Sequence, residues 1–419
     1  MKNPNRKLGR GAKLALAGVA LAAVVSTPLM AGAASIGNTP FAVKATNASE
    51  SKFWGIRPFV KGSGSTNTGS GTTNPTTPPT TPADPAARTV SMTIDTRLPG
   101  CTADKFNLQV WGDINFLPNA RINWGDGTTS DVKNGQTYNH SYTDAKQYDL
   151  TIDGRLMGLY RNVDEDVAGA QNCIKSVDHL GSDTGMTLLT GFLYKASNVT
   201  YMAPPPPTVT NLRSLLLDAT SFNGKVSDWD VSNVTDFTGA FMGATSFNQP
   251  IDSWNMGKAT IIADMFYGAS NFNQPLNSWN ISKVTNTSGV FKNAVKFNQP
   301  LDNWDTSNVD SHMSIMFEGA TAFNQDITGW NVSKVKNFTE MFSGATAFNQ
   351  PIGAKWKPVA ANQVGGMFAD ARSFKQDLST WNFSSVPDSE KRSFAARSAM
   401  IAEYLPQGIP VQDGLTGVN

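Results

Sequence analysis

This sequence lacks a large net charge of either sign. Its 34 lysine and arginine residues nearly balance its 33 aspartate and glutamate residues, so the formal net charge is +1. Binding to nucleic acid or to an anionic membrane surface needs a concentrated basic patch. The charge balance therefore disfavours both kinds of partner, and we expect no nucleic-acid partner.

Histidine and the motifs of common enzymes are also scarce. The three histidines, His140, His179 and His312, have no second histidine or cysteine at metal-ligand spacing, and neither a G-x-S-x-G motif nor a glycine-rich phosphate loop occurs. Asp164-Glu165-Asp166 offers carboxylates for calcium but lacks the glycine of a calcium loop, so a solvated acidic run is the simpler interpretation. We predict a protein that is not an enzyme and has no cofactor or metal site.

Only two cysteines occur, Cys101 and Cys173, and they flank one module of the chain. In an exported protein a cysteine pair is more often bridged than free. A disulfide here would close a loop of about 70 residues and contribute about 4 kcal/mol in the chain-entropy description. Two thiols without neighbouring histidines make a poor metal site, so a disulfide is the predicted role.

A long apolar run is present only near the start of the chain, at residues 14–25. Basic residues precede it, and Ala31-Gly32-Ala33 follows it as a small-residue cleavage point, so residues 1–34 are predicted to be a signal peptide. The run is short for a membrane span, although an uncleaved anchor is the alternative. If the signal is removed, we expect no membrane span in the mature chain and an extracellular location, secreted or at the cell surface.

Changes in composition divide the remainder into four parts. Residues 35–88 are rich in Gly, Ser, Thr and Pro towards their end and predict a disordered linker. Residues 89–172 predict a small β module, residues 173–386 carry repeats, and residues 387–419 form a C-terminal cap and tail.

The β module is predicted from four segments in which apolar and polar residues alternate, at 91–94, 106–111, 120–124 and 148–152. Within it, Trp124-Gly-Asp-Gly127 and His140-Ser-Tyr142 resemble the WGDG and H-x-Y signatures of PKD-like modules. The resemblance implies an antiparallel β-sandwich. In that setting His140 is expected to be structural.

One sequence motif recurs between residues 222 and 381 with a spacing of 25 residues, occasionally 26. It consists of Phe-Asn and a tryptophan six or seven residues after the asparagine. Such a period predicts a solenoid whose phenylalanines and tryptophans stack between repeats and whose asparagines bond to tight turns. A sugar-stacking tryptophan platform is the alternative. The central members are Phe247, Asn248, Trp254, Phe272, Asn273, Trp279, Phe297, Asn298, Trp304, Phe323, Asn324 and Trp330.

The consensus MF-x-GA-x-x-FNQP-[LI]-x-x-W-N-[VI]-S-x-V resembles the BspA-type leucine-rich repeats of bacterial surface proteins. The likeness covers residues 122–383 and implies a secreted or surface-exposed protein that binds host, matrix or neighbouring-cell proteins or glycans. Leu405-Pro-Gln-Gly408 lacks the threonine of the LPxTG sorting signal, so covalent wall anchoring is not expected.

The predicted fold class is therefore β-rich: a small antiparallel β-sandwich module followed by a leucine-rich-repeat-type solenoid. Short strands lie around the tryptophans, and the spacing from Met341 to Ala345 predicts a short helical turn in each repeat. A helix from about residue 388 to residue 403, with Phe394 and Ile401 on one face, is predicted to cap the last repeat. A partner-binding helix is the alternative.

Binding is assigned to columns of residues that vary between repeats, since the repeated residues have structural roles. Stacked strands place column neighbours about 5 Å apart, so Lys258 beside Lys283 is a weak sign of an anionic partner, and a solvated face is the preferred interpretation. The candidate positions are Asn233, Lys258, Lys283, Asn308 and Lys334 in one column and Asp252, Asn277 and Asp302 in another.

The sequence thus leads to a first functional hypothesis, an exported, non-enzymatic repeat protein that presents its surface for adhesion or for protein or glycan recognition. The second is a structural subunit of a surface layer or extracellular assembly, in which the chain associates with copies of itself. A third is an accessory carbohydrate-binding protein, whose tryptophan fluorescence should respond to added glycans.

Overall fold

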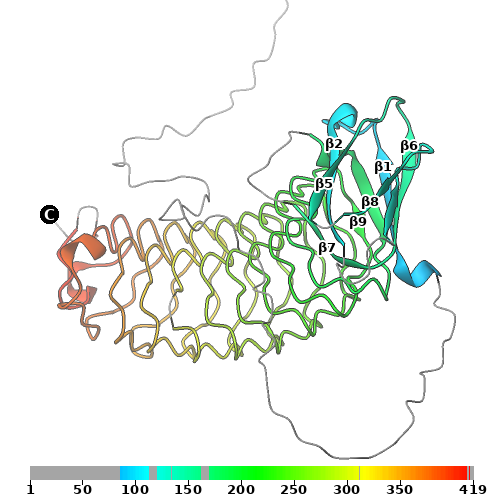
Figure 1. Cartoon of the computed structure of the whole chain (residues 1–419). Helices are drawn as coiled ribbons and strands as arrows, with labels where there is room; N and C mark the ends of the chain where they lie inside the picture. Colours follow the sequence, from blue (N-terminus) through cyan, green and yellow to red (C-terminus); the bar gives the residue numbers. More distant parts are fainter. Residues whose placement is uncertain are drawn as a thin grey trace, which may run out of the picture. The chain divides into compact units, whose positions relative to one another are not determined.

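The computed structural model describes residues 85–112, 120–133, 135–161, 169–310, 312–412 and 415 (Figure 1). The predicted signal peptide, the linker up to residue 84 and the acidic run at residues 164–166 lie outside these residues. The elements are η1 (Pro85–Arg88), β1 (Thr89–Asp95), η2 (Ala103–Lys105), β2 (Phe106–Gly112), β3 (Arg121–Asn123), β4 (Thr129–Asp131), β5 (Gln136–His140), β6 (Gln147–Asp153), β7 (Leu156–Tyr160), η3 (Gln171–Cys173), β8 (Ile174–His179), β9 (Tyr201–Met202), η4 (Asp388–Glu390) and η5 (Ala402–Tyr404).

Two sheets build the β module. One has the strand order β4-β3-β6-β1-β8-β9 and the other the order β5-β2-β7. Strands β1 and β6 pair antiparallel over their whole length, and the inward residues of β1 alternate with outward ones, as expected for a strand with one buried face. Phe106 of β2 meets Trp124 beside β3 edge to face, with ring centroids 6.4 Å apart, so the two sheets share one core.

A disulfide joins Cys101, in the loop after β1, to Cys173 at the end of η3. The two cysteines are 72 positions apart, and the bridge ties the start of the β module to the strand that leads into the repeats. It is found where the sequence places the candidate pair.

After β8 the repeats stack on one another. Single parallel β-bridges join equivalent residues of successive repeats, beginning at β7. Each bridge residue opens a segment whose alternate N–H groups donate to carbonyl groups of the next repeat, and we call these the ladder segments. The bridge row runs through Gly158, Leu188, Asn211, Asp236, Ile261, Asn286, His312, Asn337 and Gln363, and the complete ladder segments are 188–195, 211–218, 236–243, 261–268, 286–293, 312–319, 337–344 and 363–370.

The predicted leucine-rich-repeat-type solenoid of short strands and short helical turns is wrong. Among the described residues from 203 to 387 there is neither a strand nor a helix, only turns and isolated bridges. The segment around Met341 shows the reason: Met341 N donates to Phe338 O and Ser343 N to Glu340 O, which are overlapping turns, and Glu340 and Gly344 have φ of 54° and 68°. A residue in the left-handed region ends a right-handed helical turn.

The predicted C-terminal capping helix is also wrong. Within the described residues after 387, η4 and η5 are short 3-10 turns, and Ser393 and Arg397 between them have φ of 56° and 59°. Two left-handed residues four positions apart break the helical path that the apolar spacing predicts. In the part of the chain that the structure describes, no helix is long and apolar enough to cross a membrane.

Aromatic columns fill the interior of the stack. Trp254 and Trp279 lie with ring centroids 6.5 Å apart and planes within 2°, and Phe247 stacks on Phe272 at 5.7 Å. Trp254 Nε1 also donates to the Val226 carbonyl at 2.9 Å, a bond repeated by every later tryptophan of the column. These tryptophans are at most 4 % exposed, so their ring faces are not open to a sugar. Each large side chain buried in this way contributes about 1.5–3 kcal/mol.

The repeated asparagines form a second column. Asn273 Oδ1 accepts from Asn298 N at 2.9 Å and from Gln299 Nε2 at 3.1 Å. Asn248 Oδ1 accepts in the same way from Asn273 N and Gln274 Nε2. Each asparagine therefore satisfies a main-chain N–H that the turn of the next repeat leaves without an acceptor.

This ladder predicts the effect of Asn273→Ala. The substitution removes the acceptor of Asn298 N and Gln299 Nε2, and leaving part-buried donors unsatisfied should lower the free energy of unfolding by about 1–3 kcal/mol. Urea unfolding followed by circular dichroism measures it. Asn303→Ala, at an exposed side chain of the next repeat, should change stability by less than about 0.5 kcal/mol. Equal losses in both variants would refute the structural role of the asparagine column.

Candidate functional site

Every ladder segment contains two residues in the left-handed region of backbone conformation, four positions apart. Their N–H groups donate to the next repeat, as Asp264 N does to Ser288 O at 2.8 Å. The first left-handed position is occupied by Gly191, Ser214, Gly239, Asp264, Gly289, Ile315, Glu340 and Gly366, and the second by Lys195, Asp218, Gly243, Gly268, Asn293, Gly319, Gly344 and Asp370. Ser393 and Arg397, after the last ladder segment, have the same backbone conformation.

Side chains at these positions lie over glycines of the following repeat. A Cβ atom built on Gly289 would lie 2.0 Å from Asp264 Oδ1, and one built on Gly243 would lie 2.1 Å from Asp218 Oδ1. Asn293 is placed in the same way over a glycine, with its Oδ1 2.2 Å from the corresponding position. Glycine suits these positions for two reasons. Its backbone adopts the left-handed conformation readily, and its missing Cβ leaves the space that the neighbouring side chain fills.

Asp264 is the most deeply buried acid of this set. The residue is 6 % exposed, and its Oδ1 is fully buried without a hydrogen-bond partner. Burial raises the pKa of Asp264 to about 6, and the charges of Lys292 and Arg213 oppose this shift only in part.

Two other acids of the row, Asp218 and Asp370, are influenced by cations. Burial raises the pKa of Asp218, and the charge of Lys195 opposes the shift. The pKa of Asp370 is lowered, chiefly by its hydrogen bond from Arg397. Asp218, Asp264 and Asp370 therefore share one backbone conformation, while the charges and hydrogen bonds around their carboxyl groups differ.

Lys292 lies between repeats in the middle of the row. Its Nζ is 2.7 Å from Glu318 Oε2 and 5.3 Å from the ring centre of Tyr267. Burial acts to lower the pKa of Lys292, but the Glu318 carboxylate outweighs it and the net shift is upward. Burial and the charge of Glu318 raise the pKa of Glu340 in the next repeat. The Lys292 charge is thus held by Glu318.

The column of asparagines and lysines predicted to bind a partner is largely bonded to itself. Lys258 Nζ donates to Asn233 Oδ1 at 2.6 Å, and Lys334 Nζ lies 3.4 Å from Asn308 Oδ1. Lys283, between these two pairs, is exposed. Asn308 separates Lys283 from Lys334, whereas Lys258 and Lys283 remain neighbours in the column.

The second predicted column, Asp252, Asn277 and Asp302, also forms bonds between repeats. Asn277 Nδ2 donates to Asp302 Oδ1 at 2.9 Å, and Asp252 Oδ1 accepts from Ser278 N at 3.1 Å. These residues remain partly exposed or exposed. The structure brings each column together as a row along the stack and does not bring the two columns into one site.

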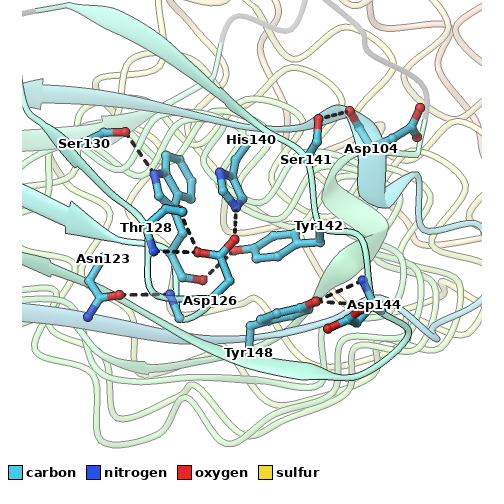
Figure 2. A network of polar contacts seen from close by, with 12 residues as sticks. Asp104, Asn123, Asp126, Thr128, Ser130, His140, Ser141, Tyr142, Asp144 and Tyr148 are labelled. Atoms are coloured by element: carbon cyan, nitrogen blue, oxygen red, sulfur yellow. Dashed lines mark hydrogen bonds and ion pairs between the residues drawn. The ribbon is translucent and has the colours of Figure 1, made fainter.

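The WGDG and H-x-Y residues of the β module form a closed polar network (Figure 2). Asp126 accepts from Thr128 N at 2.9 Å and from His140 Nε2 at 2.8 Å. His140 stacks on Trp124 with ring centroids 4.5 Å apart, and Tyr142 donates to the Trp124 carbonyl at 3.0 Å. Burial acts to raise the pKa of Asp126, but the bonds from Thr128 and His140 lower it. Each polar group has its partner inside the network, which gives it a structural role.

Comparison with known proteins adds a family match without a function. Residues 205–304 and 285–403 match a family model described as Mycoplasma protein of unknown function, DUF285. The two matches overlap and together span the repeats. No curated protein matches the chain, and no solved structure matches it. The resemblance to BspA-type repeats stays a prediction from the sequence.

The ladder segments were not among the candidate positions drawn from the sequence. A signal was present, because Gly, Asn or Asp precedes the repeated alanine in Gly243-Ala244, Asn293-Ala294 and Asp370-Ala371. These three residue types are the ones that enter the left-handed region most readily.

The burial of Asp264 predicts a pH-dependent gain in stability for Asp264→Asn. The folded pKa of about 6 lies above the unfolded value of about 4, so the folded state binds more protons between these values and its stability rises as pH falls. The asparagine variant lacks this cost. It should be more stable than the parent by about 2–3 kcal/mol at pH 8, with the difference closing as pH falls from 6 to 4.

Urea unfolding at a series of pH values measures this difference. Asp252→Asn, which removes a carboxylate at a more exposed position, is the matched control. A stability difference for Asp264→Asn that is constant from pH 4 to pH 8 would contradict the assignment.

Proposed function

We propose that this chain is an exported, non-enzymatic repeat protein that recognises proteins or glycans of a host, a matrix or neighbouring cells through the surface of its repeat stack. The observation that carries the proposal is how residues are used within each repeat. Repeated residues serve contacts between repeats: Trp254 Nε1 bonds to Val226 O, and Asn248 Oδ1 accepts from Asn273 N. At the surface, by contrast, equivalent positions differ in charge, as the exposed residues Lys258, Lys283 and Asn308 show.

Two further features support this function. Equivalent surface residues of the stacked repeats follow one another at about 5 Å, so an extended partner meets a row of side chains that can each add a small contribution. The basic and apolar stretch at residues 1–34 has the pattern of an export signal, which places the predicted partners outside the cytoplasm.

The test is binding of the purified chain to immobilised matrix proteins, to a glycan array and to whole cells. We expect saturable binding to at least one of these. Replacing Lys258, Lys283 and Lys334 together by alanine should weaken that binding about tenfold if the lysine column contacts the partner, since exposed ion pairs contribute up to about 1 kcal/mol each.

The matched control for the triple variant replaces Lys225, Lys336 and Lys375, which are exposed lysines outside the column. This variant should bind like the parent. Absence of saturable binding on every surface would contradict the recognition function, and equal loss in both triple variants would show that charge alone, not the column, drives binding.

A second candidate function, a structural subunit of an extracellular assembly, is favoured by the last repeat. Asp370 N donates to a carbonyl of that repeat at 2.8 Å, but among the described residues the corresponding N–H groups of Ser393 and Arg397 have no acceptor. The N–H of Ala395 between them bonds to the Gln412 side chain. The ladder therefore ends with two N–H groups to which carbonyl groups of another chain can bond.

Light scattering over a range of concentrations decides for or against assembly. End-to-end association through these donors should raise the average mass steadily with concentration. Arg397→Pro removes one donor and its backbone conformation, and it should suppress that rise. A constant monomer mass of the parent chain at high concentration would remove this candidate.

A further inference from the structure

The carboxyl group of Asp264 is buried without a hydrogen bond or an ion pair, whereas the carboxyl group of Asp370 in the same left-handed row bonds to Arg397. Asp264 is 6 % exposed, its Oδ1 is fully buried, and neither of its carboxyl oxygens has a hydrogen-bond partner. Only Oδ1 is fully buried, so the carboxyl group reaches the surface through Oδ2.

The two cations nearest to Asp264 are engaged by other carboxylates. Lys292 Nζ lies 2.7 Å from Glu318, and Arg213 lies 3.9 Å from Asp236. Both therefore offset the Asp264 charge only from a distance, as part of the field that acts on it. An isolated carboxylate in such a setting is costly unless a cation is supplied to it.

A neutral side chain fits the same place. Asn293, at the second left-handed position, lies over Gly319 as Asp264 lies over Gly289, with corresponding distances of 2.2 Å and 2.0 Å. The shape of the stack therefore does not require a carboxylate at residue 264. Charge is the one property that asparagine would not provide there.

An organic cation suits this position better than a metal ion does. In the described part of the chain no three His, Cys, Asp or Glu residues are grouped so that they could hold a metal ion. A divalent cation would find one carboxylate, whereas calcium takes six to eight oxygen ligands. A guanidinium or ammonium group can be held by one carboxylate through charge-assisted hydrogen bonds.

We propose that Asp264 is the receptor for an arginine or lysine side chain of a partner polypeptide that docks on the ladder segments. The proposal rests on the proposed function, because it names the chemistry that the repeat surface recognises. The basic group binds to the carboxylate at Asp264 Oδ2, on the side away from Gly289, and adds the cation that the stack itself does not place there.

The test is an NMR titration of the intact chain carrying ¹³C-labelled aspartate, with the Asp264 signal identified by its loss in Asp264→Asn. The probes are N-acetyl-arginine amide and N-acetyl-lysine amide, and the uncharged N-acetyl-citrulline amide is the control. A cation that binds only the ionised carboxylate lowers its apparent pKa, so the Asp264 titration should shift to lower pH by at least half a pH unit at saturating probe.

Three results would overturn the proposal. The Asp264 titration does not move with either basic probe; it moves as far with the citrulline probe; or calcium ions move it and the basic probes do not. Affinity for the basic probe should also fall by about tenfold one pH unit below the Asp264 midpoint, because the carboxylate is then mostly protonated.

The same variants separate this proposal from the broader function. If the parent chain binds matrix or cells and Asp264→Asn binds equally well, recognition stands and the Asp264 receptor is refuted. If the basic probes shift the Asp264 titration but the chain binds no surface, the receptor stands and the proposed biological setting is refuted. Glu340→Gln, an exposed acid of the same row, is the control and should leave both readouts unchanged.

Discussion

The structure depends on one constraint: each repeat must point alternate N–H groups at the next repeat while its apolar side chains stay inside. Two left-handed residues in each ladder segment meet this constraint, as Asp264 N and Gly268 N show by donating to Ser288 O and Lys292 O at 2.8 and 2.7 Å. A left-handed residue other than glycine costs about 1–2 kcal/mol. The bond to the next repeat, together with the buried column beneath it, offsets that cost, so the conformation is stable only within the stack.

The same constraint decides which residues can follow one another along the stack. A left-handed side chain such as Asp218 or Asn293 occupies the space over the next repeat, and glycine stands there. Adjacent repeats therefore cannot both carry such side chains at that position without one of them turning away, as Ile315 does when its Cδ1 leans back towards Gly289. Variation at the surface is coupled between neighbours, unlike variation in an independent exposed loop.

Sequence alone predicted the parts of the fold that repeat strictly. The phenylalanine, asparagine and tryptophan columns follow from a fixed period, because every repeat solves the same packing problem. Helical turns were predicted wrongly around Met341, since apolar spacing cannot distinguish a helical turn from overlapping turns that contain left-handed residues.

In the β module the alternating segments coincide with β1, β2, β3 and β6, whereas β5 carries exposed polar residues and gave no hydrophobic signal. Asp264 was missed because its isolation depends on Lys292 and Arg213 being engaged elsewhere, which no local pattern records.

These observations bear on where a recognition surface on this stack can differ from repeat to repeat. The tryptophan and asparagine columns cannot change without loss of stacking. The lysine and asparagine column can change, but Lys258 and Asn233 bond to each other, so part of its polarity is already satisfied. At the left-handed positions the backbone is fixed by the ladder while the side chain is free to vary wherever a glycine follows. Asp264 is one such side chain, and its buried carboxyl group has no hydrogen-bond partner within the stack. Ionising this buried group costs stability, a cost that asparagine would avoid. Under the proposed function, such a cost is explained only if another molecule brings the opposite charge.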